Sequence, residues 1–155
     1  MEIDSSTTIL RPFKLSDVDD FMIWASDDQV MRPWNTFTSK EEALTYIKDV
    51  CIPTLGARSI YILDRWIGIV LIYPGSDDDR CRADIRYAVA VEFWGQGMAT
   101  KAVKIALSEV SKDFPEVVRL QAYVDVQNKA YQRVLEKVGF LHEGLLRKYC
   151  YLKGQ

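Results

Sequence analysis

A glycine-containing turn is the segment of this chain whose residue types and spacing best suit chemistry. Gly95 and Gly97 fall almost together, although the 155 residues include only eight glycines. Glycine lets the backbone approach a ligand closely, and the free N–H groups at a helix start carry the positive end of the helix dipole. The turn therefore predicts either a phosphate-binding site or a turn that only permits tight packing of a helix on a sheet. It is neither a P-loop nor a dinucleotide fingerprint, because no GKS or GKT and no third glycine follow.

Asp84 is an acidic residue with basic neighbours. This carboxylate stands between Arg82 and Arg86 in a segment of alternating apolar and polar residues, so all three share one face of an expected strand. Neighbouring cations favour the ionised form of a carboxylate and weaken it as a base. From these neighbours alone, Asp84 is expected to belong to a salt-bridge ladder.

The other reactive side chains give no catalytic signature. His142 is the single histidine, and no serine or cysteine stands at a recognisable nucleophile turn, which excludes a hydrolase signature. Cys51, Cys81 and Cys150 are odd in number and widely separated, which excludes a disulfide framework and a CxxC-type metal site. The three aspartates at 77–79 are expected to form a solvated turn, because cation loops need spaced ligands. We therefore expect no metal.

The composition is that of one globular domain with a substantial apolar core. Apolar residues make up 48% of the chain and charged residues 27%, so disorder is not expected. The formal charge of −2 argues against broad affinity for nucleic acids or membranes. The N-terminus is acidic and polar, and no apolar run approaches the roughly 18 residues of a membrane span. We expect a soluble, cytoplasmic protein.

Helical periodicity is strongest directly after the glycine turn. Apolar residues from Ala99 to Val110 recur at spacings of three and four and predict a helix packed on a sheet. Ser16 is expected to cap an earlier helix, and Ser39 with Glu42 forms a capping box for another. The buried stripe expected for that capping-box helix comprises Ala43, Leu44, Ile47 and Val50. A last helix over 130–138 is expected to end at Gly139.

Strand patterns fill most of the remaining chain. They are expected at 7–13, 82–89, 117–124 and 140–152, with a hairpin at 58–73 that turns at Asp64-Arg65. The 82–89 strand alternates Ala83, Ile85, Tyr87 and Val89 on one face with the charged residues on the other. This order of elements predicts a mixed α/β (α+β) domain with a predominantly antiparallel sheet.

Three segments carry a resemblance to a known family. The run from Tyr87 to Ala102 resembles the acetyl-CoA-binding motif of the GNAT N-acetyltransferases. The run from Asn128 to Phe140, followed by Glu143-Gly144, is similar to the closing motif of the branch that acetylates ribosomal-protein N-termini. Leu10-Arg11-Pro12 with Asp17 looks like the opening of that branch. The resemblance implies a GNAT fold over residues 1–155, with flanking helices and a splayed pair of parallel strands.

The resemblance also implies acetyl-CoA as co-substrate. Its pyrophosphate would be held by backbone amides of the turn and helix start, namely Gly95, Gln96, Gly97, Met98, Ala99 and Thr100. Val89 and Val91 would offer main-chain groups to the pantetheine arm, and Asn128 would hydrogen-bond that arm. Asn128 is equally suited to cap the following helix, and both roles can hold together.

The implied reaction is direct attack of a neutral amine on the acetyl thioester, through a tetrahedral intermediate, with departure of the CoA thiolate. Asp84 matches the position where the branch usually carries a glutamate base, and would act as that base, contact the substrate amine or stay in the salt-bridge ladder. Tyr131 stands where the branch usually has a serine, and would donate a proton to the thiolate, contact CoA or pack. Trp34 would line the acceptor mouth or cap the core.

The acceptor stays open at this point between a protein N-terminus and a small-molecule amine. An alternative is a non-catalytic acyl-CoA-binding or regulatory domain of the same fold. The family continues past 149–151 into a final strand, and the 155 residues would lack it. The sheet edge would then be covered by a partner or by a second copy of the chain in a homodimer.

Overall fold

The computed structural model describes residues 9–11, 13–27, 30, 37–62, 65–125 and 127–146. Five strands form one sheet in the order β1-β2-β3-β4-β5. They are β1 (Ile9–Arg11), β2 (Ala57–Ile62), β3 (Arg65–Pro74), β4 (Arg82–Val89) and β5 (Arg119–Gln121). Neighbours from β1 to β4 pair antiparallel, while β4 and β5 pair parallel. The mixed and mostly antiparallel sheet expected from the sequence is confirmed.

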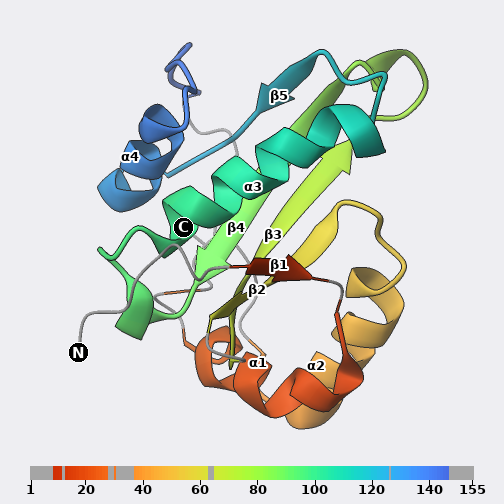
Figure 1. The fold of residues 1–155 in the computed structure, drawn as a ribbon, viewed down its shortest axis with the longest axis vertical. Helices are drawn as coiled ribbons and strands as arrows, with labels where there is room; N and C mark the ends of the chain where they lie inside the picture. The colour runs from red at the N-terminus through yellow and green to blue at the C-terminus, as the bar shows by residue number, and fades with distance from the viewer. Residues whose placement is uncertain are drawn as a thin grey trace.

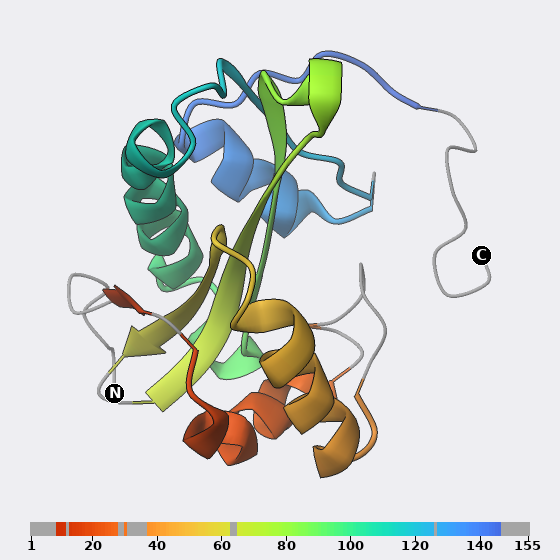
Figure 2. The ribbon, with the colours of Figure 1, turned by 90° about the vertical axis from the view of Figure 1, so that its right-hand side faces the viewer.

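In the described part of the chain, four α-helices cover the sheet. Helices α1 (Val18–Ala25) and α2 (Lys40–Tyr46) pack together on one face, and α3 (Met98–Asp113) and α4 (Lys129–Lys137) pack together on the other (Figures 1 and 2). Short helical turns occupy Leu15–Asp17, Ile47–Cys51, Asp77–Asp79 and Val91–Phe93. No helix within the described ranges combines the length and apolar character needed to cross a bilayer.

The core lies on both faces of β3 and β4, because these strands are central and covered from both sides. Every residue of β3 from Trp66 to Ile72 is buried. On the α1/α2 face, Trp66 is enclosed by aromatic rings, and its backbone carbonyl accepts a hydrogen bond of 3.2 Å from the Trp24 indole. Such rings bury large apolar areas, so this cluster anchors α1 and α2 to the sheet.

Two predicted elements agree closely with the structure. Strand β4 has the expected bounds and burial alternation, with Ala83, Ile85 and Tyr87 buried and Arg82 and Arg86 exposed. Helix α4 ends as expected, because Gly139 at φ 103° permits the left-handed backbone of a C′ residue. The N–H groups at 139 and 140 then donate to the carbonyls at 136 and 135, which completes a Schellman motif.

The helix predictions fail at two positions. Ser16 lies inside the turn at Leu15–Asp17, and Asp17 is the N-cap of α1. Val50 is exposed, and Cys51 is buried in its place. The physical reason is that α2 continues as a π-helical turn over Ile47–Cys51, whose wider spacing rotates the apolar face by one residue. Ser39 does cap α2, because its Oγ accepts from the Glu42 N–H at 3.1 Å.

The strand predictions are too long at the C-terminal end. Of the expected strand 117–124, only Arg119–Gln121 pairs with β4. Residues 140–146 form no strand, although alternating apolar residues suggested one, and Leu141 and Leu145 are exposed. Pairing requires a neighbour at the right register, which the local pattern does not contain. Residues 7, 8, 12, 63, 64 and 147–152 of the predicted strands and hairpin lie outside the described residues.

Candidate active site

The two parallel strands diverge next to the charged residues of β4. They pair at Arg82 with Arg119, Ala83 with Leu120, and Asp84 with Gln121. Beyond Asp84, β4 continues to Val89 without a partner on this side. Main-chain groups of alternate residues point to the same edge of a strand, so Ile85, Tyr87 and Val89 present theirs toward the gap. This gap is an opening in a sheet where an extended ligand can hydrogen-bond to backbone.

Tyr131 reaches this open edge from α4. Its hydroxyl accepts a hydrogen bond of 3.1 Å from the Tyr87 N–H, and the Tyr87 hydroxyl donates to the Tyr131 carbonyl at 3.2 Å. The two rings stack with centroids 4.0 Å apart at an interplanar angle of 9°. Burial raises the pKa of Tyr131 to about 12, against smaller opposing effects of the Tyr87 N–H and the Arg86 charge. Tyr131 is therefore a neutral phenol at physiological pH.

The glycine turn leaves β4 and begins α3. Gly95 and Gly97 have φ values of 75° and 83°, and Gly97 is the N-cap residue of α3. The first helical hydrogen bond runs from the Lys101 N–H to the Gly97 carbonyl at 3.0 Å, and no side chain caps the helix. The N–H groups of residues 98–100 therefore have no acceptor within the helix. This helix start leaves main-chain donors free for an anion, and the binding of one here stays a prediction.

The side-chain amide of Gln96 is only partly hydrogen-bonded. Its Nε2 donates to the Glu92 carbonyl at 3.0 Å, while its Oε1 is buried and accepts from no group in the described part of the chain. A buried acceptor without a donor is costly, so a ligand that donates here would stabilise the turn. The Met98 side chain is fully buried, which leaves only its main chain for a ligand.

Trp94 holds the end of β4 against the turn. Its indole donates to the Val89 carbonyl at 2.7 Å, and its N–H donates to the Val91 carbonyl at 3.0 Å. Val91 lies in the helical turn at Val91–Phe93 rather than in a strand. Both carbonyls thus have partners within the chain. The contact of Val89 and Val91 with pantetheine stays a prediction.

Asn128 caps α4. Its Oδ1 accepts from the Tyr131 N–H at 3.1 Å, so the capping role is confirmed. This cap fixes the first turn of α4 and with it the residue whose hydroxyl reaches β4. The side-chain amide N–H groups of Asn128 donate to no described residue, and its contact with a ligand stays a prediction.

Asp84 lies on the opposite face from Tyr131. It stands opposite Tyr73 of β3 on the α1/α2 face and accepts a hydrogen bond of 2.8 Å from Gln121 Nε2. Arg82 pairs instead with Asp79 at 2.9 Å. Among the described residues neither arginine pairs with Asp84, so the salt-bridge ladder is not formed. Asp84 and Tyr131 therefore flank the same strand edge from its two sides. Trp34 lies outside the described residues.

Three residues at this site were missed by reasoning from the sequence. Tyr73, Gln121 and Tyr87 join it through strand register and through a contact between β4 and α4. The alternation of β3 and β4 signals that Tyr73 shares a face with Asp84 once their pairing is known. No local sequence pattern predicts that Gln121 lies beside Asp84, because this contact depends on the parallel pairing of β4 with β5.

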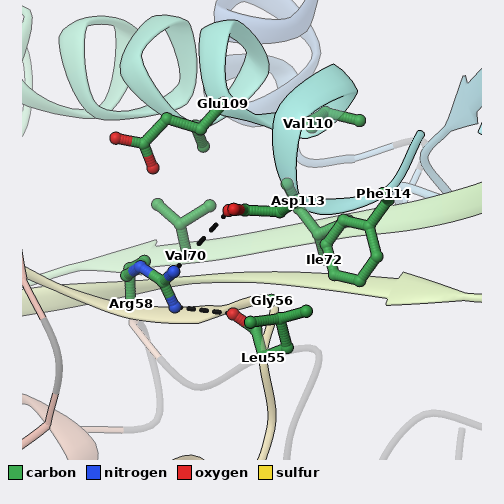
Figure 3. Close-up of a pocket in the computed structure, with 10 residues that line it drawn as sticks. Leu55, Gly56, Arg58, Val70, Ile72, Glu109, Val110, Asp113 and Phe114 are labelled. Atoms are coloured by element: carbon green, nitrogen blue, oxygen red, sulfur yellow. Dashed lines mark hydrogen bonds and ion pairs between the residues drawn. The ribbon is translucent and has the colours of Figure 1, made fainter.

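The remaining candidates lie apart from this site. Burial raises the pKa of Cys51 to about 12, so this thiol is a core residue rather than a nucleophile. No group of three metal-binding side chains occurs within the described ranges. A small pocket between β2, β3 and the C-terminal half of α3 contains Arg58, which pairs with Asp113 at 3.6 Å and donates to the Leu55 carbonyl at 2.6 Å (Figure 3). Through these contacts Arg58 joins β2 to the C-terminal end of α3, which is the end far from the glycine turn.

Comparison with known proteins assigns the family. A model of the acetyltransferase (GNAT) domain matches residues 7–141, and the chain belongs to this family of acetyltransferases. The uncharacterized N-acetyltransferase YoaA of Bacillus subtilis is 28% identical over 166 residues, covering 98% of this chain and 89% of YoaA. The structure of RimJ from Mycobacterium smegmatis, in complex with CoA-disulfide, matches at a TM-score of 0.79 and 25% identity, covering 99% of this chain and 79% of RimJ.

A second solved structure has the same fold. RimL, a ribosomal L7/L12 alpha-N-protein acetyltransferase in complex with coenzyme A, matches at a TM-score of 0.80 and 19% identity, covering 96% of this chain and 88% of RimL. The family resemblance and the fold implied by the two sequence motifs are thereby confirmed.

Proposed function

We propose that the protein transfers an acetyl group from acetyl-CoA to a primary amine, either a protein N-terminus or a small molecule. The observation that carries the proposal is the edge of β4 beyond Asp84, which has no strand partner among the described residues and leads through the turn at 90–97 to a helix start without a side-chain cap. An extended pantetheine arm needs such an edge, and a pyrophosphate needs such a helix start. The CoA bound to RimJ supports this assignment.

The residues present fit CoA. Backbone amides of the turn, at Gly95, Gln96, Gly97, Met98, Ala99 and Thr100, would hold the pyrophosphate. Val89, Val91 and Asn128 would flank the pantetheine arm. Acetyl-CoA supplies an acetyl group activated as a thioester. Binding through main-chain donors explains how a chain of net charge −2 holds a polyanion.

Two side chains would serve the transfer. A nitrogen–carbon bond forms as the carbon–sulfur bond breaks, the amine loses a proton and the sulfur regains one. Asp84 would accept the amine proton, directly or through water. Tyr131 would donate a hydrogen bond to the sulfur. Its pKa of about 12 lies above that of an ordinary thiol near 8.5, so it would stabilise the thiolate without giving up its proton completely.

The acceptor is proposed from the site and the relatives together. The name of RimL specifies a protein N-terminus as the acceptor of that enzyme. The same fold hosts other acceptors, so small amines remain in the proposal. The α1/α2 face next to Asp84 would receive the amine, because Tyr131 and α4 cover the other face of this edge.

The test is release of free CoA thiol from acetyl-CoA in the presence of peptides, amino acids, polyamines and amino sugars. Thiol release that depends on one amine class, with a matching mass gain of one acetyl group on that amine, supports the proposal. Calorimetric binding of acetyl-CoA without thiol release for any amine would indicate an acyl-CoA-binding regulatory domain instead. Absence of binding would overturn both assignments.

A further inference from the structure

Two arginines of the sheet, Arg11 and Arg86, form no ion pair with a described residue, and Arg11 lies over the Tyr61 ring at 3.5 Å. Arg58 pairs with Asp113, Arg65 with Glu92, Arg82 with Asp79 and Arg119 with Glu143. Arg86 is exposed on β4 and has no hydrogen bond or ion pair to any described residue. A guanidinium offers five donors in a planar fork and suits carboxylates and phosphates. An unpaired one beside a candidate active site is thus a site for an anionic group.

Arg86 lies near several polar groups at the point where β4 and β5 separate. Burial raises the pKa of Tyr46, Tyr73 and Tyr131, and the Arg86 charge acts in the opposite direction on all three. The guanidinium therefore lies within electrostatic reach of hydroxyls from α2, β3 and α4. Asp84 precedes Arg86 by two residues on the same strand face, which places their Cβ atoms about 7 Å apart.

We propose that Asp84 and Arg86 together recognise an acceptor that carries an anionic group close to its amine. This inference rests on the proposed acetyl transfer and specifies its substrate class. The amine would lie against the Asp84 carboxylate, and the anionic group would pair with the Arg86 guanidinium. Two sources share this chemistry: the α-carboxylate of a free amino acid, and an acidic side chain near a peptide N-terminus.

The same pair disfavours polycations. A polyamine that places one ammonium on Asp84 brings a second positive charge toward Arg86, and like charges repel in a partly desolvated site. Asp84 alone would attract any amine, so Arg86 is the residue that discriminates between acceptors. It is a specificity-determining residue in this proposal, not a proton carrier.

The experiment compares acceptors that differ in the charge of one group near the amine. L-serine is compared with L-serinamide, a Ser-Glu peptide with a Ser-Lys peptide, and both pairs with spermidine, at fixed acetyl-CoA with thiol release as the signal. We expect kcat/KM to be about tenfold higher for the anionic member of at least one pair, as for a charge-assisted hydrogen bond. The pair that shows the larger ratio identifies the source of the anionic group. Spermidine should be the poorest acceptor.

Two arginine variants provide a matched control. Arg86→Gln and Arg82→Gln each remove one exposed positive charge, two residues from Asp84 on the same strand face. Arg86→Gln should abolish the preference for the anionic acceptor, whereas Arg82→Gln should retain it within about twofold, because Arg82 already pairs with Asp79. Calorimetry adds a readout without turnover: N-acetylserine should bind the wild type more tightly than N-acetylserinamide, and only Arg86→Gln should remove this difference.

The outcomes separate the inference from the proposed function. Transfer that favours spermidine, or a charge preference that survives Arg86→Gln, overturns the inference while acetyl transfer stands. Equal loss of the preference in both arginine variants also overturns it, because net charge would then suffice. Acetyl-CoA binding without thiol release for any amine overturns the proposed function, and with it the inference.

Discussion

The two sides of the diverging strands are built from different parts of the chain. The proposed CoA side consists of main-chain groups, namely the helix N–H groups after Gly97 and the edge of β4 at Tyr87. The proposed acceptor side consists of side chains from separate elements, with Asp84 and Arg86 on one face of β4 and Tyr73 of β3 opposite Asp84. Every residue supplies backbone groups, so the only feature of the sequence that indicates the proposed CoA side is the position of its glycines. The second side depends on the identity of individual side chains.

This difference determines how each side responds to mutation. A side-chain site is altered by exchanging one functional group with no change in backbone. A main-chain site is insensitive to most side-chain exchanges and fails only when the backbone conformation changes. The predictions below follow from this contrast, and their expected effects decrease in order.

Asp84→Asn should give the largest effect. The amide is nearly isosteric and can still accept the hydrogen bond from Gln121, but it cannot take a proton from the amine. Turnover measured by thiol release should fall by about 10²- to 10⁴-fold, the range for a lost general base. CoA affinity should change little, because the carboxylate lies on the acceptor side.

Two variants control for charge and geometry in this test. Asp84→Glu should keep substantial activity, since it restores a carboxylate at the same position. Asp79→Asn removes an exposed carboxylate that pairs with Arg82, and should leave turnover within about twofold. Full turnover in Asp84→Asn would assign proton removal to another group and leave Asp84 a binding role only.

Gly95→Val should give the next largest effect, on CoA affinity. Gly95 and Gly139 both have positive φ, 75° and 103°, and an added Cβ would meet no atom within 4 Å at either position. Valine at each site therefore costs mainly backbone strain, about 1–2 kcal/mol. Only Gly95→Val should also weaken CoA binding in calorimetry, by about tenfold or more, as the helix start loses its anion geometry.

Gly139→Val is the matched control, because it strains the end of α4 away from the turn. Equal losses of CoA affinity in the two variants would mean that reduced stability alone explains them. A loss confined to Gly95→Val would confirm that the conformation of the turn binds the cofactor.

The parts of the fold set by local patterns could be predicted from the sequence. Alternation defined β4, and apolar periodicity defined α3, because each pattern repeats over a whole element. The glycine C′ residue of α4 was equally local. Val50 was misplaced because a π-helical turn leaves no sequence mark, and β5 was overestimated because its pairing depends on the path of β4.

The site divides in the same way. Gly95 and Gly97 marked the anion-binding turn, since positive φ has a residue signature. The contacts Tyr87 with Tyr131, and Asp84 with Tyr73 and Gln121, join residues far apart in the chain. Such contacts follow from register and helix packing, which single-residue patterns do not contain. The resemblance to a family indicated Tyr131, but only the structure shows that Tyr131 stacks on Tyr87.

Tyr131→Phe tests the contact between the two sides of the site, where the Tyr131 hydroxyl accepts a hydrogen bond from the Tyr87 N–H. Phenylalanine keeps the stacking on Tyr87 and removes only the hydroxyl. We expect kcat to fall by about tenfold, the value of one lost hydrogen bond to a developing charge. Because burial holds the pKa of Tyr131 at about 12, the ratio of wild-type to variant rates should stay constant from about pH 6 to pH 10.

The same pKa gives a stability signature. The folded protein keeps the Tyr131 proton up to about pH 12, while the unfolded chain releases it near pH 10. This contribution to stability is complete below pH 10 and is lost as the pH rises toward 12. Chemical denaturation should therefore show the wild type losing free energy of unfolding over this interval more steeply than Tyr131→Phe. Identical slopes would contradict burial of this phenol.

The smallest effects are expected at the helix caps, where Ser39 and Asn128 form a matched pair. Each accepts a hydrogen bond of 3.1 Å from a backbone N–H three residues later. Ser39→Ala and Asn128→Ala should each lower the free energy of unfolding by about 1 kcal/mol.

Asn128→Ala should also weaken CoA binding by about two- to tenfold, if its amide donates to the pantetheine arm. Asn128→Asp separates the two roles, because a carboxylate caps α4 but cannot donate. Retained stability with weakened CoA binding in Asn128→Asp would show that one side chain serves both the helix and the cofactor, whereas unchanged binding would reduce Asn128 to a cap.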